Sequence, residues 1–157
     1  MTQEFRKFFF TGMTISAALL SGCAENSNFN FENATIEERQ EWMDKQAAKL
    51  RTSARFGLPS GGGPTALSMK LDSIDTRPRT RELQMNIAVK VPYGATVSTI
   101  PYSDGLVLAC RNYVKTRLYD QEVRLITVFK TKKDERQLLK LTASPRKCDK
   151  ALDEADL

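Results

Sequence analysis

Apolar and polar residues alternate along much of the chain after residue 65. The clearest alternation runs from Leu83 to Val91, which is typical of a strand with one face in a core and the other in water. A shorter alternation covers Leu67 to Leu71, and two further apolar runs cover Val123 to Phe129 and Leu138 to Ala143. These four segments predict four strands.

Between the second and third of these strands the apolar spacing becomes helical. Ser103 is a suitable cap for a helix that reaches about Leu118. Its inward residues are Leu106, Ala109, Cys110, Tyr113 and Val114. The predicted order is therefore strand, strand, helix, strand, strand (ββαββ) over residues 66–148. An antiparallel sheet with one helix packed on its apolar face would bury the apolar side of every predicted strand and of the helix, so we expect an α+β domain.

A second helical pattern precedes the strands. Thr35 and Glu38 have the spacing of a capping box, and Gly57 followed by Pro59 ends the pattern, so we expect a helix over residues 35–57. Its apolar stripe is narrow: Ile36, Met43, Ala47, Leu50 and Ala54, with Trp42 beside it. Either this amphipathic helix lies across its own domain, or it pairs with a partner protein through Ile36, Trp42, Met43 and Leu50.

Glycine and proline separate this helix from the strands. Residues 58–65 contain three consecutive glycines, which lose too much backbone entropy in a helix or strand. A phosphate loop would need a following lysine with serine or threonine and the start of a helix, and neither is present here. We therefore interpret residues 58–65 as a linker.

The first 22 residues have the layout of an export signal. Arg6 and Lys7 precede an uncharged segment from Phe8 to Leu20, as in a secretory signal peptide. This segment is shorter than the ~20 apolar residues that a membrane-spanning helix needs. The alternative is a buried first helix, but the segment shows no helical period.

The export signal leads into Leu20-Ser21-Gly22-Cys23, a tetrapeptide that resembles the lipobox of bacterial lipoproteins. The resemblance covers only the signal peptide. It implies that the thiol of Cys23 receives a diacylglyceryl group, that residues 1–22 are removed, and that the new amine is acylated with a chain such as palmitate. Because Ala24 and Glu25 come next, it also implies the periplasmic face of the outer membrane, or the cell membrane in a Gram-positive organism. Two or three acyl chains anchor a protein durably.

A polar leader joins the expected anchor to the helix. Residues 23–34 contain several asparagines, and they form a lipidated tether that can reach about 36 Å beyond Cys23 when extended. Phe29 and Phe31 are its only large apolar residues. They contact the membrane interface, a partner, or the protein's own domain, and the sequence leaves all three open.

Composition excludes several kinds of chemistry. The chain has no histidine, so His-dependent catalytic triads and His-containing zinc sites are impossible within it. No spaced acidic or cysteine cluster suggests a metal, and no motif places a catalytic pair, Ser103-Asp104-Gly105 included. The 24 basic and 19 acidic residues form a mixed surface without the basic and aromatic interleaving of a nucleic-acid site. We expect no enzyme, cofactor or metal.

Two cysteines remain once Cys23 is assigned to the lipid. Cys110 lies on the predicted helix and Cys148 comes just after the last strand. Because the compartment of an exported protein permits oxidation, we expect a disulfide between them, although two unpaired buried thiols are the alternative. Residues 149–157 would then form a short acidic tail.

Three arginines, Arg77, Arg79 and Arg81, alternate where the second strand begins. On one side of the chain they could bind phosphate or carboxylate groups, or acidic residues of a partner. A solvated turn at the end of the sheet is the alternative that we favour, because such turns are commonly rich in Arg, Thr and Pro.

These observations support two hypotheses. In the first, the protein is a lipid-anchored structural or assembly component of a larger envelope complex of the secretion or transport type. In the second, it is a periplasmic binding module for a small molecule or a cell-wall fragment. A deep apolar cavity or a group of convergent polar side chains would favour the second.

Overall fold

The computed structural model describes residues 29–57, 68–91 and 102–155. The expected signal peptide (1–22), the lipobox, the start of the tether and the linker (58–65) lie outside these residues, as do the side chains of residues 55–57. The described elements are α2 (Ile36–Gly57), β1 (Ser68–Arg77), β2 (Glu82–Lys90), α3 (Tyr102–Tyr113), α4 (Arg117–Asp120), β3 (Arg124–Thr131), β4 (Gln137–Ala143) and α5 (Pro145–Ala155).

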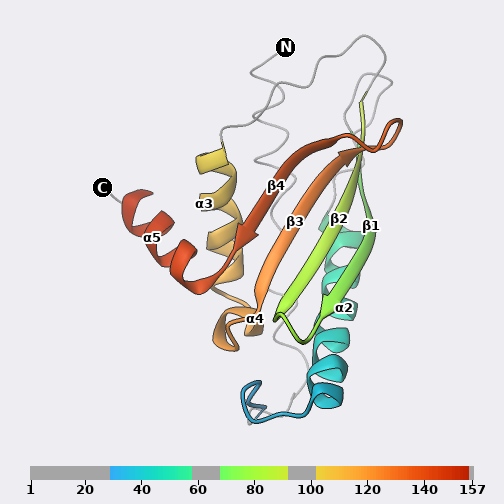
Figure 1. Ribbon diagram of the computed structural model, residues 1–157. Helices are drawn as coiled ribbons and strands as arrows, with labels where there is room; N and C mark the ends of the chain where they lie inside the picture. The colour runs from blue at the N-terminus through green and yellow to red at the C-terminus, as the bar shows by residue number, and fades with distance from the viewer. Residues whose placement is uncertain (1–28, 58–67, 92–101, 156–157) are drawn as a thin grey trace.

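The four strands form one mixed sheet in the order β1-β2-β3-β4 (Figure 1). β1 and β2 are antiparallel, β2 and β3 are parallel, and β3 and β4 are antiparallel. The expectation of a wholly antiparallel sheet is therefore wrong at its centre. The connection through α3 returns the chain to the end of the sheet where β2 began, so β3 runs in the same direction as β2.

The helices also differ from the expected single packed helix. The pattern from Ser103 to Leu118 forms two helices, because Thr116 is extended and its hydroxyl donates to the carbonyl of Tyr113 at the end of α3 (2.7 Å). Residues 149–155 belong to α5, so the expected acidic tail is instead part of a helix, with Ala151 buried. The α+β class holds, but the strict ββαββ arrangement with one helix does not.

The two longer helices that pack on the sheet, α2 and α3, contact the same face of it (Figure 1). α2 lies against β1 and buries Met43 and Leu50 with Ile74 and Met85 in one apolar cluster. α3 lies against β4, where Gly105 faces the side chain of Leu141. We call this side of the sheet the helix face. The opposite side carries polar side chains of β1 and β2 and the buried apolar Ile126 and Val128 of β3, and we call it the polar face.

Registers decide which side chains lie on each face. Leu83, Met85, Ile87 and Val89 of β2 point to the helix face and are all at most 8% exposed, as their alternation predicted. Gln84, Asn86, Ala88 and Lys90 lie on the polar face. One strand therefore separates a core from a surface, residue by residue.

Cys110 of α3 and Cys148 of α5 form a disulfide and are both fully buried. A second contact joins α4 to α5, because the hydroxyl of Tyr119 donates to Asp149 (3.0 Å). α5 is thus fixed to α3 at one place and to α4 at another.

Candidate functional site

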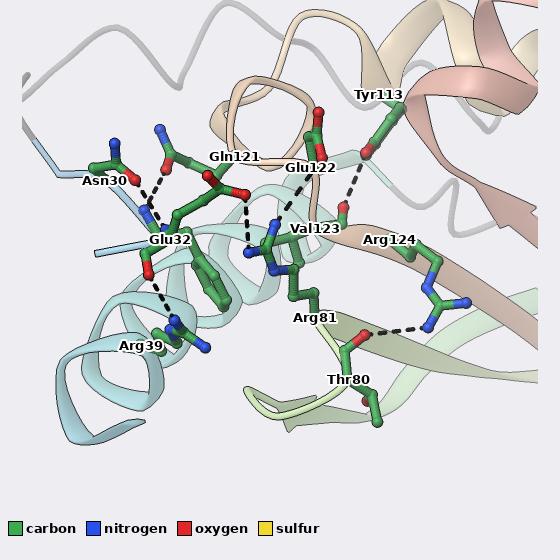
Figure 2. A network of polar contacts seen from close by, with 11 residues as sticks. Asn30, Glu32, Arg39, Thr80, Arg81, Tyr113, Gln121, Glu122, Val123 and Arg124 are labelled. Atoms are coloured by element: carbon green, nitrogen blue, oxygen red, sulfur yellow. Dashed lines mark hydrogen bonds and ion pairs between the residues drawn. The ribbon is translucent and has the colours of Figure 1, made fainter. Parts of the chain in front are cut away.

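The three arginines named as a possible anion or partner contact have different surroundings. Arg77 is at the end of β1 and is ion-paired with Glu82 (3.6 Å). Arg79 is exposed in the turn after β1. Arg81 has a left-handed backbone conformation (φ 52°) and is paired with Glu32 (3.3 Å) and more loosely with Glu122 (4.0 Å), as Figure 2 shows.

Arg81 instead belongs to an aromatic junction formed by Phe29, Phe31 and Trp42. Phe29 stacks on Trp42 with ring centres 5.1 Å apart, and Phe31 meets Trp42 edge-on at 5.8 Å. The guanidinium groups of Arg39 and Arg81 lie 5.2 Å and 5.4 Å from the centre of the Phe31 ring. This arrangement allows cation–π attraction between two arginines and one buried ring.

Backbone hydrogen bonds hold the same junction together (Figure 2). The amide of Phe31 donates to the side-chain oxygen of Gln121 (2.8 Å), and Arg39 donates to the carbonyl of Glu32 (2.9 Å). Thr35 and Glu38 form the expected capping box at the start of α2. Residues 29–34 therefore pack on the domain. Of the three alternatives for Phe29 and Phe31, the structure shows the third, contact with the protein's own domain.

The α2 residues proposed for a partner are mostly used by the chain's own core. Trp42, Met43 and Leu50 are buried, at 7%, 0% and 6% exposure, and only Ile36 at the start of the helix is half-buried. Gln40 and Asp44 also bind the hydroxyl of Thr76 on β1, at 2.7 Å and 2.9 Å. The apolar stripe of α2 is therefore unavailable to another protein.

The tyrosines with raised pKa values have structural explanations. Tyr113 is fully buried and donates to the carbonyl of Val123 (2.9 Å). Burial is the largest of the causes that raise the pKa of Tyr113 far above the usual range, and repulsion from the charges of Tyr119 and Glu122 adds to it. The hydrogen bond to Asp149 raises the pKa of Tyr119. Each hydroxyl is engaged in holding elements together, so neither is a free acid or base.

Neither a metal site nor a triad emerges from the described residues. Among residues 29–57, 68–91 and 102–155, no group of three or more potential ligands could hold a metal ion. Ser103 donates to Asp104 at 3.4 Å, and both are exposed on the first turn of α3.

A depression of about 570 Å³ opens on the polar face at the opposite end of the sheet from the aromatic junction. Its lining comes from β1, β2, β3 and the turn after β3: Ser68, Lys70, Asp72, Ser73, Asn86, Ile87, Ala88, Lys90, Lys130, Thr131, Lys132 and Glu135. We call it the lysine depression. It contains four lysines and two carboxylates, so its charged lining is net positive.

The strand registers explain its shape. Lys70 of β1 pairs with Ala88 of β2, and Ala88 pairs with Lys130 of β3, so one row across three strands reads Lys-Ala-Lys. The small alanine between two long side chains leaves a hollow. Lys90 is two residues further along β2, and the backbone amide of Lys132 donates to the carbonyl of Val89 (3.0 Å), which places the turn beside it.

None of the four lysines in the depression makes an ion pair or a hydrogen bond with its side chain in the part of the chain that the structure describes. The neighbouring polar groups are satisfied differently: Asn86 donates to Ser73 (2.8 Å) and to Asp75 (2.9 Å), and Gln84 donates to Asn86 (2.9 Å). The depression thus has a fixed polar wall and unpaired cations.

Sequence reasoning missed this site because its residues are distant along the chain. The outward series of β2 already showed a small residue, Ala88, before Lys90. Lys130 comes next to Ala88 only through the parallel pairing of β2 with β3, and that pairing was not predicted. The sequence alone therefore could not place Lys130 beside Ala88.

Comparisons with protein family models, curated proteins and solved structures found no match for this chain. No described helix is both long and apolar enough to pass through a bilayer.

Proposed function

We propose that the protein is a lipid-anchored envelope lipoprotein whose α+β domain serves as a component of a larger envelope assembly. The lipobox at Leu20-Ser21-Gly22-Cys23 supports the anchor. The proposed location is the periplasmic face of the outer membrane. The domain contributes no catalytic group to this role and acts through its surface.

The observation that carries this proposal is the docking of the segment before α2. Because Phe29 and Phe31 pack against Trp42, the tether is held on the domain from Phe29 onward rather than only from residue 35. The chain from Cys23 to Phe29 can span at most about 21 Å. A lipid on Cys23 would therefore hold the folded body close to the bilayer, with the aromatic junction on the membrane side.

The partner surface in this proposal is the polar face of the sheet. α2 is consumed by the protein's own core, so it no longer argues for a helical partner. The described helices that pack on the sheet, α2 and α3, leave the polar face free of helices. That face extends away from the aromatic junction, which suits a domain that presents a surface to an assembly.

The anchor is tested by metabolic labelling with a palmitate analogue. We expect label on the wild-type chain, globomycin-sensitive processing, and loss of both label and membrane association in Cys23→Ser. Ser21→Ala is the matched control, because it keeps a small residue in the lipobox and should still be labelled. A chain that stays unlabelled and soluble would contradict the anchor.

The assembly role is tested by site-specific photocross-linking in native membranes. A cross-linking residue at Asn86 or Thr142, on the polar face, should give one discrete product with a protein present in stoichiometric amounts. The same residue at Lys147, on the exposed side of α5, is the control and should give none. Equal products from both sides of the domain would contradict a role for the polar face.

The lysine depression also favours the second hypothesis, a binding module. Its lysines and the hydrogen-bonded Asn86 and Ser73 are the convergent polar side chains that such a module needs, although the depression is not a deep apolar cavity. Discrete cross-links at Asn86 without any ligand binding would favour the assembly role alone.

A further inference from the structure

We propose that the lysine depression is a binding site for a phosphate-bearing anion. This site would give the polar face of the proposed assembly component a specific ligand chemistry. Only the source of the ligand depends on the assembly role. The juxtaposition that carries it is the row of Lys70, Ala88 and Lys130 across three strands, with Lys90 and Lys132 at its end.

The row has the dimensions of a clamp around one small anion. Neighbouring strands are about 4.8 Å apart, so Lys70 and Lys130 start about 10 Å apart, two strands away from each other. Four-carbon side chains can bring both ammonium groups onto a group held above Ala88. A carboxylate at position 88 would neutralise the pair, and alanine leaves the space open instead.

The absence of an ion pair in the described part of the chain distinguishes these lysines from the arginines of the sheet and its β1–β2 turn, apart from Arg79. Arg124 is paired with Glu82 at 3.0 Å, and Arg77 and Arg81 have carboxylate partners as well. In the depression, Asp72 and Glu135 make no ion pair with any lysine in the described part of the chain. The ammonium groups keep their full capacity to bind an external anion.

Lysine favours phosphate over carboxylate here. The cations that line the depression are all lysines, each a point charge with three donors that suits a tetrahedral group with several oxygens. Planar bidentate recognition of a carboxylate would call for arginine, and none lines the depression.

The polar wall adds a neutral donor. The oxygen of Ser73 accepts from Asn86, and the described residues provide no acceptor for the Ser73 hydroxyl hydrogen, which can therefore donate to an anion. The two carboxylates limit the excess of positive charge, so the site suits one phosphate or diphosphate group better than a long polyanion.

The ligand is carried by a molecule beyond the protein's own bilayer. The anchor end of the domain is the aromatic junction, next to the turn between β1 and β2, and the lysine depression is at the other end of these strands (Figure 1). From Glu82 to Ala88, β2 spans about 20 Å. Lipid headgroups next to the anchor would therefore lie about that far from the row of Lys70, Ala88 and Lys130.

The test is calorimetric titration of the full-length chain, purified in a neutral detergent, with sodium pyrophosphate. We expect saturable binding to the wild type with one site per chain. In Lys70→Gln/Lys130→Gln the affinity should fall by about tenfold or more, because two charge-assisted contacts are lost.

Lys115→Gln/Lys147→Gln is the matched control. It removes the same charge from two exposed lysines on the helix side of the molecule, and its affinity should stay within about twofold of the wild type. Equal losses in both double variants would show a general effect of net charge and overturn the site. So would an absence of pyrophosphate binding to the wild type, and that result would leave the anchor and the cross-linking result of the assembly role intact.

A second arm distinguishes the source of the phosphate. The wild type is reconstituted in vesicles of phosphatidylcholine, with or without phosphatidylglycerol, and titrated again at high salt to suppress surface potential. We expect the same pyrophosphate affinity in both. A lower pyrophosphate affinity of the wild type in the phosphatidylglycerol vesicles alone, with no such difference between vesicles for Lys70→Gln/Lys130→Gln, would mean that the lipid headgroup occupies the site. That result would overturn the assignment of a ligand beyond the bilayer.

Discussion

The basic side chains at the two ends of the sheet have different surroundings. At the end where β1 turns into β2, Arg81 is held by carboxylates and by the ring of Phe31. At the other end, Lys70, Lys90, Lys130 and Lys132 line a depression without an ion pair in the described chain. The arginines stabilise the fold, whereas the lysines remain available.

This difference shows that a basic cluster in a sequence does not by itself indicate a binding site. Arg77, Arg79 and Arg81 are adjacent along the chain and drew attention for that reason, yet two of them are paired within the protein. The four lysines are scattered along the chain and meet only in the folded sheet. Availability depends on partners, and partners depend on the fold.

The largest effect should come from Phe31 at the junction end. Phe31→Ala removes a ring that is 1% exposed and packed against Trp42, and the free energy of unfolding should fall by about 3–5 kcal/mol. Urea unfolding followed by tryptophan fluorescence measures this loss. A loss below about 1 kcal/mol would mean that residues 29–34 do not belong to the folded body, and the comparison of the two ends would fail.

Tyr113→Phe probes the buried hydrogen bond that supports the same end. Without the hydroxyl, the carbonyl of Val123 is left without that donor, and we expect a loss of about 1–3 kcal/mol. The wild type should also keep the Tyr113 hydroxyl protonated under alkaline conditions that ionise ordinary tyrosines, since its pKa is raised. Absorbance titration of wild type and variant would show this difference, and a normal titration of every tyrosine would contradict the burial.

Arg81→Ala should have an intermediate effect. It removes ion pairs at 3.3 Å and 4.0 Å and one cation–π contact from a side chain that is 30% exposed, so we expect a loss of about 1 kcal/mol. Arg81→Lys serves as the control, because it keeps the charge but not the planar group. The part of the loss due to the ion pair should shrink in high salt, and a loss of zero in both variants would remove the contrast with the lysines.

Lys70→Gln/Lys130→Gln should leave the stability almost unchanged. Neither lysine has a partner to lose in the described chain, and the like charges face each other across Ala88, so the change should stay within about 0.5 kcal/mol. Thermal and urea unfolding of the variant and wild type provide the measurement. A loss as large as that of Arg81→Ala would show that these lysines are structural too.

Asp134, beside the lysine depression, should contribute the smallest effect, and one that depends on pH. The hydroxyl of Thr131 donates to Asp134 and lowers its pKa below the usual 3.8. Because the folded chain holds this proton less tightly than the unfolded chain, the stabilisation is complete above pH 3.8 and is lost as the pH falls through the lower folded value. Asp134→Asn should remove this dependence.

The measurement is urea unfolding of the wild type and Asp134→Asn at neutral pH and in the acid range. Their difference should narrow steadily below pH 3.8. A constant difference at every pH would mean that Asp134 does not titrate differently in the two states.

The local elements could be predicted from the sequence because their signals are local. The alternation of β2, the capping box of Thr35 and Glu38, and the inward positions of Cys110 and Tyr113 each depend on a few neighbouring residues. The break after Tyr113 was missed because the apolar spacing continues to Leu118, and only the extended backbone of Thr116 ends the helix.

The parallel central pair and the lysine depression could not be predicted in the same way. No local pattern states whether β3 runs with β2 or against it, and the depression exists only because Lys130 comes beside Ala88. The role of α2 was likewise ambiguous, since a narrow stripe fits a partner as well as the protein's own core. Tertiary contacts decided both questions.

The parallel pairing at the centre also affects the order in which the sheet can assemble. β1 with β2 and β3 with β4 are hairpins whose strands are close along the chain, and each can close quickly. The seam between them joins Glu82 to Arg124 and must wait until α3 has brought the chain back across the sheet. We therefore expect two halves that form early and a central seam that closes late and limits the folding rate. The lysine row crosses that seam, so it becomes complete only in the last step of folding.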